Sequence, residues 1–137
     1  MRLRLGTALL ICWLVGSASS SAYDLEHVRR ALATKICPGC DLAMANLGNV
    51  DFANADLSGA NVSNADVHMA SFYAANLIET DFSGSNLRYA NFFNADLTGA
   101  DLSGAQLNGA ILTGASLDGV TFCGTIWTDG SLRNDGC

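Results

Sequence analysis

Five cysteines are the residues of this 137-residue chain best suited to chemistry. Cys12 lies in an apolar stretch near the start, whereas Cys37, Cys40, Cys123 and Cys137 lie beyond it. An even number of cysteines in an oxidising compartment favours disulfide bonds. We therefore expect the last four cysteines to form two disulfides.

The spacing Cys37-Pro38-Gly39-Cys40 also fits a dithiol redox motif, so a thiol oxidoreductase is a second hypothesis. Redox cysteines of this kind depend on a helix N-terminus that makes one thiol acidic, within a βαβ unit. The sequence has no pattern typical of such a unit. A structural disulfide is the favoured interpretation.

The two histidines, His27 and His68, have no serine, cysteine or paired carboxylate nearby in a spacing typical of catalysis. The recurrent glycines close short repeated units and do not form a phosphate-cradling loop. We therefore predict no catalytic residue, no metal site and no cofactor. The sequence favours a non-enzymatic structural or protein-interaction module.

Residues 1–22 are typical of a secretory signal peptide. Arg2 and Arg4 form a basic start, an apolar run follows as far as Val15, and small residues precede Ala22. The apolar run is shorter than the ~20 residues needed to cross a bilayer. We expect export to the periplasm or the extracellular space, or to the thylakoid lumen of a photosynthetic source. No membrane attachment is expected after cleavage.

A five-residue register runs without insertion from Cys40 to Gly124, which gives 17 units. The third residue of every unit is apolar, a series with a chance probability on the order of 10⁻⁵ in a chain that is half hydrophobic. These third residues are Leu42, Leu47, Phe52, Leu57, Val62, Val67, Phe72, Leu77, Phe82, Leu87, Phe92, Leu97, Leu102, Leu107, Leu112, Leu117 and Phe122.

A period of five fits neither an α-helix nor a straight strand. Successive third positions would move by about 140° around a helix, and they would fall on alternate faces of a strand. The chain must therefore turn once in each unit. The Asp, Asn, Ser and Gly residues that flank each apolar residue favour such tight turns.

The large side chains indicate how many units close one coil. Phe52, Phe72 and Phe92 recur every 20 residues, and a coil of four units would place them in one stack. The unit is a small residue, Asp or Asn, Leu or Phe and two variable positions, and over residues 40–124 it resembles the repeat of the pentapeptide-repeat family. The resemblance implies an all-β fold, a right-handed quadrilateral β-helix, in which the first and third residues point inward.

Residues 23–39 are expected to form an N-terminal capping segment with a short helix. Asp24 can cap the N-terminus of this helix, and Leu25, Val28 and Leu32 fall on one of its faces. A solenoid needs such a cover, because the end coil has no neighbour against which to bury its edge.

The coil count limits how the cysteines pair. Cys40 and Cys123 lie about four coils apart, or ~20 Å at the usual strand spacing of ~4.8 Å, whereas a disulfide needs Cα atoms within ~7 Å. Cys37 is therefore expected to pair with Cys40, and Cys123 with Cys137, which would pin residues 125–137 over the C-terminal end. The same distance excludes a zinc site shared by all four.

One group of outward side chains is not explained by the repeat. Aromatic, sulfur-containing and basic residues gather on an otherwise Ser-, Thr-, Asn- and Gly-rich lattice, and we predict a contact surface for an unknown protein partner or for self-association. The alternative is that these are ordinary scattered surface residues without a role. They stack in pairs that are 20 residues apart: His68 with Arg88, Met69 with Tyr89, and Tyr73 with Phe93.

Acidic side chains form stripes on the same lattice. Asp41, Asp81 and Asp101 share one face, and Asp56 and Asp96 share another. The favoured interpretation is that they solvate the exterior and brace turns. The alternative is an inhibitor that mimics DNA and binds topoisomerases, as some cytoplasmic members of the family do, but the export signal opposes it. Removal of the signal leaves a formal charge of −8, so no nucleic-acid partner is expected.

Overall fold

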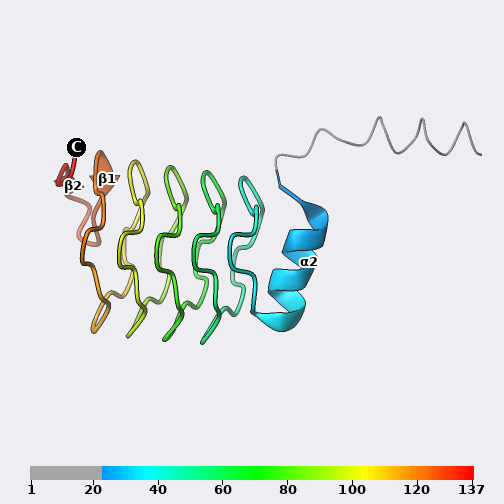
Figure 1. Ribbon diagram of the computed structural model, residues 1–137. Helices are drawn as coiled ribbons and strands as arrows, with labels where there is room; N and C mark the ends of the chain where they lie inside the picture. Colours follow the sequence, from blue (N-terminus) through cyan, green and yellow to red (C-terminus); the bar gives the residue numbers. More distant parts are fainter. Residues whose placement is uncertain (1–22) are drawn as a thin grey trace, which may run out of the picture.

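The computed structural model describes residues 23–137, and the signal peptide predicted at residues 1–22 lies outside the described residues. Helix α2 (Leu25–Thr34) stands at one end of a stack of coils. Two short strands, β1 (Thr125–Ile126) and β2 (Leu132–Arg133), lie at the other end (Figure 1). The chain between these elements winds through a regular series of turns.

The coils are joined by parallel β-bridges between residues 20 positions apart, from Ile36 with Asp56 to Gln106 with Ile126. Each bridge residue holds the second position of a five-residue unit. Four units therefore close one coil, as the phenylalanine spacing predicts. The bridges continue one unit beyond residues 40–124 at each end, because the flanking sequence keeps the same register.

Each unit turns at its fifth residue, which adopts a left-handed backbone conformation. Gly59 (φ 65°) and Asn64 (φ 54°) are typical, because Gly and Asn adopt positive φ at little cost. The second residue braces the same turn: Asp81 Oδ1 accepts a hydrogen bond from the backbone N–H of Ser83 at 2.8 Å. The polar residues of the repeat thus build its corners.

The first and third residues of each unit fill the centre of the stack with apolar side chains. The ring centroids of Phe52 and Phe92 lie 5.8 Å and 5.0 Å from that of Phe72, so the three rings form one column. Leu112 and Leu117 are only half-buried. They lie in the last coil, where no further coil covers them.

Helix α2 begins after Asp24, whose carboxylate accepts hydrogen bonds from two backbone N–H groups of the first turn, as predicted. The predicted apolar face, however, does not pack as a unit. Leu25 is 65% exposed and Leu32 is 48% exposed, while Val28 is half-buried and Ala31 is fully buried. The helix approaches the first coil through the small side chain of Ala31, which leaves the two leucines facing solvent.

The C-terminal tail folds back onto the last coil. Strands β1 and β2 pair antiparallel, and the backbone N–H of Phe122 donates to Asp135 O at 2.8 Å. The Arg133 guanidinium lies 4.1 Å from the centroid of the Phe122 ring and 4.3 Å from that of Trp127. This cation–π contact holds the tail against two large core side chains.

Candidate interaction surface

Two disulfides lie at opposite ends of the stack. The structure joins Cys37 to Cys40 and Cys123 to Cys137, with Cα atoms 5.4 Å and 4.9 Å apart. These are the pairs expected from the coil count. Cys37 and Cys40 are fully buried next to helix α2, whereas Cys137 is exposed.

Both histidines and all 13 acidic residues of the chain lie within residues 23–137. In that range no three His, Cys, Asp or Glu side chains lie close enough together to hold a metal ion. No helix within the described part of the chain is long and apolar enough to cross a membrane.

A shallow pocket of about 380 Å³ opens on the side of the stack, and we call it the Arg88 pocket. It is lined by Asp66, His68, Met69, Asn86, Arg88 and Tyr89. Four of these residues were predicted as a contact surface. Asp66 and Asn86 were missed, although each lies two positions before a predicted residue in the same unit and therefore had to be its neighbour.

Tyr73 and Phe93 form a separate feature. Their rings stack with centroids 5.6 Å apart and an interplanar angle of 3°, as the 20-residue spacing predicts. Neither residue lines the Arg88 pocket. The six predicted surface residues are therefore divided between a pocket and a ring stack.

Glycines of neighbouring coils make room for two rings of the Arg88 pocket. A Cβ atom added at Gly48 would lie 2.3 Å from a ring carbon of His68, and one added at Gly109 would lie 2.4 Å from a ring carbon of Tyr89. Real Cβ atoms do not approach so closely, so each ring lies directly over a glycine of an adjacent coil. The rings are thus held in place by the stack.

Met69 and Tyr89 occupy turn positions that do not suit them. Both are fifth residues, with φ of 55° and 59°, where Gly and Asn predominate. A left-handed conformation costs a side-chain-bearing residue roughly 1–2 kcal/mol. Both side chains are also mostly exposed, at 57% and 63%. Neither turn geometry nor core packing explains why a large side chain is present at these two positions.

Arg88 shares the pocket with one carboxylate, Asp66, but makes no ion pair with it. Its guanidinium makes no hydrogen bond or ion pair with any residue in the described range 23–137. The pocket therefore combines a cation, a thioether and a phenol ring, the composition typical of protein contact surfaces.

Comparison with known proteins identifies the repeat. Residues 45–122, more than half of the chain, match the family model described as the pentapeptide repeat region. The chain belongs to the pentapeptide-repeat family. Proteins of this family are generally non-enzymatic structural or interaction modules, and their fold is the right-handed quadrilateral β-helix.

Solved structures of other pentapeptide-repeat proteins resemble this one. A protein from the thylakoid lumen of Arabidopsis thaliana is 30% identical, with a TM-score of 0.69 over 85% of this chain and 79% of that one. HetL from Nostoc sp. strain PCC 7120, involved in heterocyst differentiation regulation, is 33% identical, with a TM-score of 0.44 over 72% and 49%. QnrB1, a plasmid-mediated fluoroquinolone resistance protein, is 26% identical, with a TM-score of 0.32 over 74% and 52%. No curated protein sequence matches.

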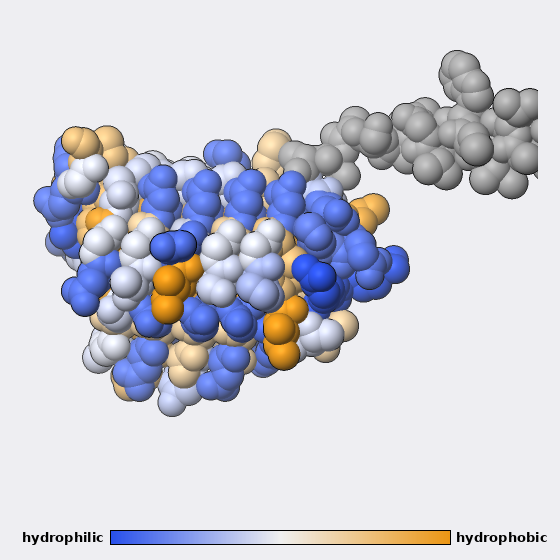
Figure 2. Space-filling model, in the orientation of Figure 1, coloured by the Kyte–Doolittle hydropathy of each residue, from blue (hydrophilic) through white to orange (hydrophobic). Residues whose placement is uncertain are grey.

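The acidic stripes of this pentapeptide-repeat protein are part of its turns. Asp41, Asn61, Asp81 and Asp101 are joined in sequence by bridges along one face. In each of them Oδ1 accepts a hydrogen bond from the backbone N–H two residues later, as Asp101 does from Ser103 at 2.8 Å. Figure 2 shows regular rows of hydrophilic residues along one face of the stack. Their hydrogen bonds to the turns explain why these carboxylates are present, and the explanation requires no binding partner.

One carboxylate of this pentapeptide-repeat protein belongs to the Arg88 pocket. Asp66 Oδ1 lies 2.8 Å from His68 Nδ1 and accepts a hydrogen bond from Asn86 Nδ2 at 3.0 Å. The side-chain hydrogen bond from His68 is the main reason that the pKa of Asp66 lies below the ordinary aspartate value of 3.8. The carboxylate therefore stays ionised beside the imidazole down to acidic pH.

The substitution His68→Ala should raise the pKa of Asp66 toward 3.8. The folded-state pKa of Asp66 lies below the unfolded-state pKa of about 3.8. The pair therefore contributes its full stability above pH 3.8, and this contribution is lost as pH falls from 3.8 through the folded-state pKa. The measurement is NMR titration of the side-chain carboxyl carbons in both proteins. Asp129 is the internal control, since its pKa is lowered by Ser131. An unchanged Asp66 midpoint would show that His68 does not set it.

Proposed function

We propose that this pentapeptide-repeat protein is an exported, non-enzymatic module that presents the Arg88 pocket to a protein partner. The observation that carries the proposal is the placement of Met69 and Tyr89 in left-handed turn positions beside an arginine whose guanidinium makes no ion pair. Strained residues persist where they serve a function, and exposed Tyr, Met and Arg side chains favour contact with proteins. The similarity to a thylakoid-lumen protein supports export.

The ends of the stack support a role as a rigid single unit. Helix α2 lies against the first coil, and the disulfide-pinned tail at residues 125–137 lies against the last. We propose that both act as caps, because an uncovered coil end would offer free backbone groups for pairing with other chains. The residues left for specific contact then lie on the sides of the stack.

We infer the kind of partner from the chemistry of the pocket. The Arg88 guanidinium suits a carboxylate, and its neighbours Met69 and Tyr89 suit an apolar side chain next to that carboxylate. The pocket also contains the Asp66 carboxylate, which already binds His68 and Asn86. We therefore propose a protein segment that carries an acidic residue beside an aliphatic or aromatic one.

The double variant Met69→Asn/Tyr89→Asn should lose this partner while it keeps the fold. Asn already occupies the same turn position at Asn64 and Asn94 and adopts positive φ easily. We expect affinity capture from the exporting compartment to retain the partner at least about tenfold less well with the variant, since central Tyr residues contribute strongly to binding. The measurement is quantitative mass spectrometry of the captured proteins.

The matched control is Met44→Asn. Met44 is an exposed methionine at an equivalent turn position, with φ of 61°, but it does not line the Arg88 pocket. A protein that wild type and Met44→Asn retain and the double variant loses supports the proposal. Equal retention by all three proteins, or no specific retention by wild type, contradicts it.

A further inference from the structure

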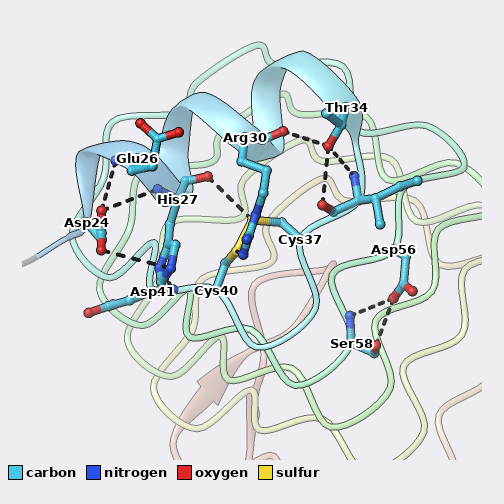
Figure 3. The surroundings of a disulfide bond; sticks show 11 residues. Asp24, Glu26, His27, Arg30, Thr34, Cys37, Cys40, Asp41, Asp56 and Ser58 are labelled. Atoms are coloured by element: carbon cyan, nitrogen blue, oxygen red, sulfur yellow. Dashed lines mark hydrogen bonds and ion pairs between the residues drawn. A yellow bond between two sulfur atoms is a disulfide. The ribbon is translucent and has the colours of Figure 1, made fainter.

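The Arg30 side chain lies across the Cys37–Cys40 disulfide (Figure 3). Its Nη2 lies 2.7 Å from Cys40 Sγ and its Nε lies 3.2 Å from Cys37 Sγ. Both cysteines are fully buried, whereas Arg30 is exposed to solvent as a residue. The guanidinium therefore covers both sulfur atoms at the junction between helix α2 and the first coil.

These sulfurs are the only side-chain partners of the Arg30 guanidinium within residues 23–137. The adjacent Arg29, by contrast, makes an ordinary ion pair with Glu26 at 3.4 Å. A neutral disulfide is a weak hydrogen-bond acceptor. Its hydrogen bonds therefore compensate only in part for the water that the guanidinium loses when it contacts the sulfurs. A thiolate at the same place would accept a charge-assisted hydrogen bond, which is about twice as strong as a neutral one.

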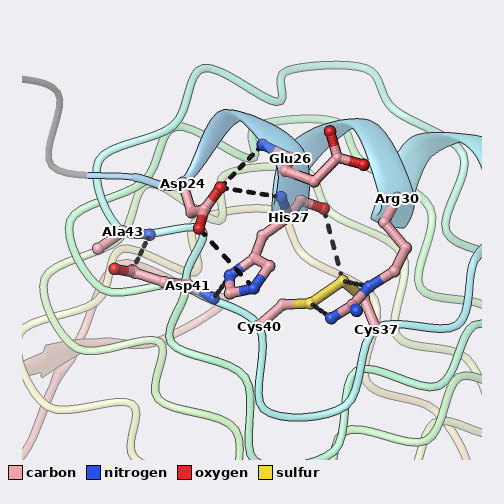
Figure 4. Close-up of polar contacts among 8 residues, drawn as sticks. All are labelled: Asp24, Glu26, His27, Arg30, Cys37, Cys40, Asp41 and Ala43. Atoms are coloured by element: carbon pink, nitrogen blue, oxygen red, sulfur yellow. Dashed lines mark hydrogen bonds and ion pairs between the residues drawn. A yellow bond between two sulfur atoms is a disulfide. The ribbon is translucent and has the colours of Figure 1, made fainter. Parts of the chain in front are cut away.

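Other polar groups at this junction are already engaged (Figure 4). His27 Nδ1 accepts a hydrogen bond from the backbone N–H of Asp41 at 2.9 Å, and its Nε2 lies 3.9 Å from Asp24 Oδ2. Asp41 Oδ1 accepts a hydrogen bond from the backbone N–H of Ala43, and Asp56 Oδ1 accepts hydrogen bonds from Ser58. Arg30 is the cation in contact with the sulfurs.

We propose that Cys37–Cys40 is a thiol–disulfide exchange site for a dithiol reductant, and that Arg30 stabilises the thiolate released by reduction. Arg30 lies closer to Cys40 than to Cys37, so Cys40 is the better leaving sulfur. This role is independent of the Arg88 pocket.

The exchange proceeds in two balanced steps. One thiolate of the reductant attacks Cys37 Sγ, the S–S bond breaks, and the electron pair remains on Cys40 Sγ beside the guanidinium. The second thiol of the reductant then attacks the mixed disulfide and releases Cys37, which takes up one proton while the other passes to water. The reductant leaves as a disulfide, and two electrons have moved to the cysteine pair. To admit the reductant, the guanidinium must uncover Cys37 Sγ while its Nη2 stays beside Cys40 Sγ.

The second disulfide lacks this arrangement and serves as an internal reference. The basic residue nearest to it in sequence is Arg133, whose guanidinium binds Asp135 and lies over two aromatic rings. No hydrogen bond from a cation to Cys123 or Cys137 is present among residues 23–137. Its redox equilibrium should therefore be insensitive to changes at Arg30.

The test is equilibration of the full-length protein with mixtures of reduced and oxidised dithiothreitol, followed by acid quench, alkylation and peptide mass mapping. In Arg30→Met the equilibrium constant for reduction of Cys37–Cys40 should fall by about tenfold, the effect of one charge-assisted hydrogen bond. That of Cys123–Cys137 should not change. Equilibrium populations separate this effect from any change in access, which alters only the rate.

Two further variants keep the test decisive. Arg29→Met removes a neighbouring charge that does not contact sulfur, and it should leave both equilibria at their wild-type values. If Arg30→Met loses helix α2 by circular dichroism, Arg30→Gln carries the same expectation, because it lacks the charge but keeps polar donors. Alkylation of the reduced protein requires a thiolate. The pH below which alkylation stops should therefore be lower in wild type than in the Arg30 variant. Equal equilibrium constants and equal alkylation profiles would overturn the proposal.

Discussion

Replacement of Phe72 by alanine should lower the free energy of unfolding by about 3–5 kcal/mol, the range for truncation of a buried phenylalanine. The Phe72 side chain is fully buried. Its ring stacks between those of Phe52 and Phe92 and meets the edge of Phe82 at 5.6 Å. Neighbouring coils on both sides fix the backbone, so the cavity cannot close by local collapse.

Equilibrium urea unfolding followed by circular dichroism measures this loss. Phe93→Ala is the matched control, because Phe93 points outward, is only half-buried and stacks on a single ring. It should cost about 1 kcal/mol, the value of one aromatic pair with partial burial. Equal losses in the two variants would show that third positions do not form a more tightly packed interior than outward positions.

The double variant Cys123→Ser/Cys137→Ser should lower the free energy of unfolding by about 3 kcal/mol. These cysteines are 14 positions apart, and a disulfide that closes a loop of this length restricts the unfolded chain by roughly that amount. The loss should be visible as an earlier unfolding midpoint in urea. Removal of both cysteines avoids a free thiol.

Cys37→Ser/Cys40→Ser is the natural comparison, since its cysteines are only three positions apart and the loop-closure contribution is smaller. We expect a clearly smaller loss than for the C-terminal pair. If the two double variants lose equal stability, or if the C-terminal variant unfolds at the wild-type midpoint, the tail is not held mainly by its disulfide.

The repeat itself could be predicted because one physical requirement recurs in every unit. Every five residues the sequence has an apolar residue that points inward and polar residues that form a tight turn. The spacing of Phe52, Phe72 and Phe92 then predicts the number of residues in one coil. The stacking of Tyr73 on Phe93 followed from the same 20-residue spacing. Regular architectures are predictable from sequence when every coil repeats the same contacts.

The first unit was missed because its inward residue is not Leu or Phe. Cys37 holds the third position of residues 35–39, is fully buried, and is followed by Gly39 with φ of 67° at the turn. Cysteine behaves as a small hydrophobic residue in a core. The cysteine spacing predicts the disulfide, but it gives no sign that Cys37 also holds an inward position of the repeat.

The ends of the stack were harder to predict than its middle. Helix α2 carries apolar residues on more than one face, so hydrophobic periodicity could not decide between the leucines and Ala31. The contact of Arg30 with two sulfurs depends on how the helix sits on the coil, and no sequence pattern encodes that angle. Single, non-repeated contacts are seen only in three dimensions.

Under the proposed function, Met69 and Tyr89 bind a partner and are not needed for folding. The free energy of unfolding of Met69→Asn/Tyr89→Asn tests this claim most directly. Both residues have positive φ and are mostly exposed, so the relief of backbone strain should offset the lost packing of the Tyr89 ring over Gly109. We predict a free energy of unfolding equal to or above that of wild type, within about 0.5 kcal/mol. A loss of more than about 2 kcal/mol would show that these side chains hold the fold together, and would contradict the proposed role of the Arg88 pocket.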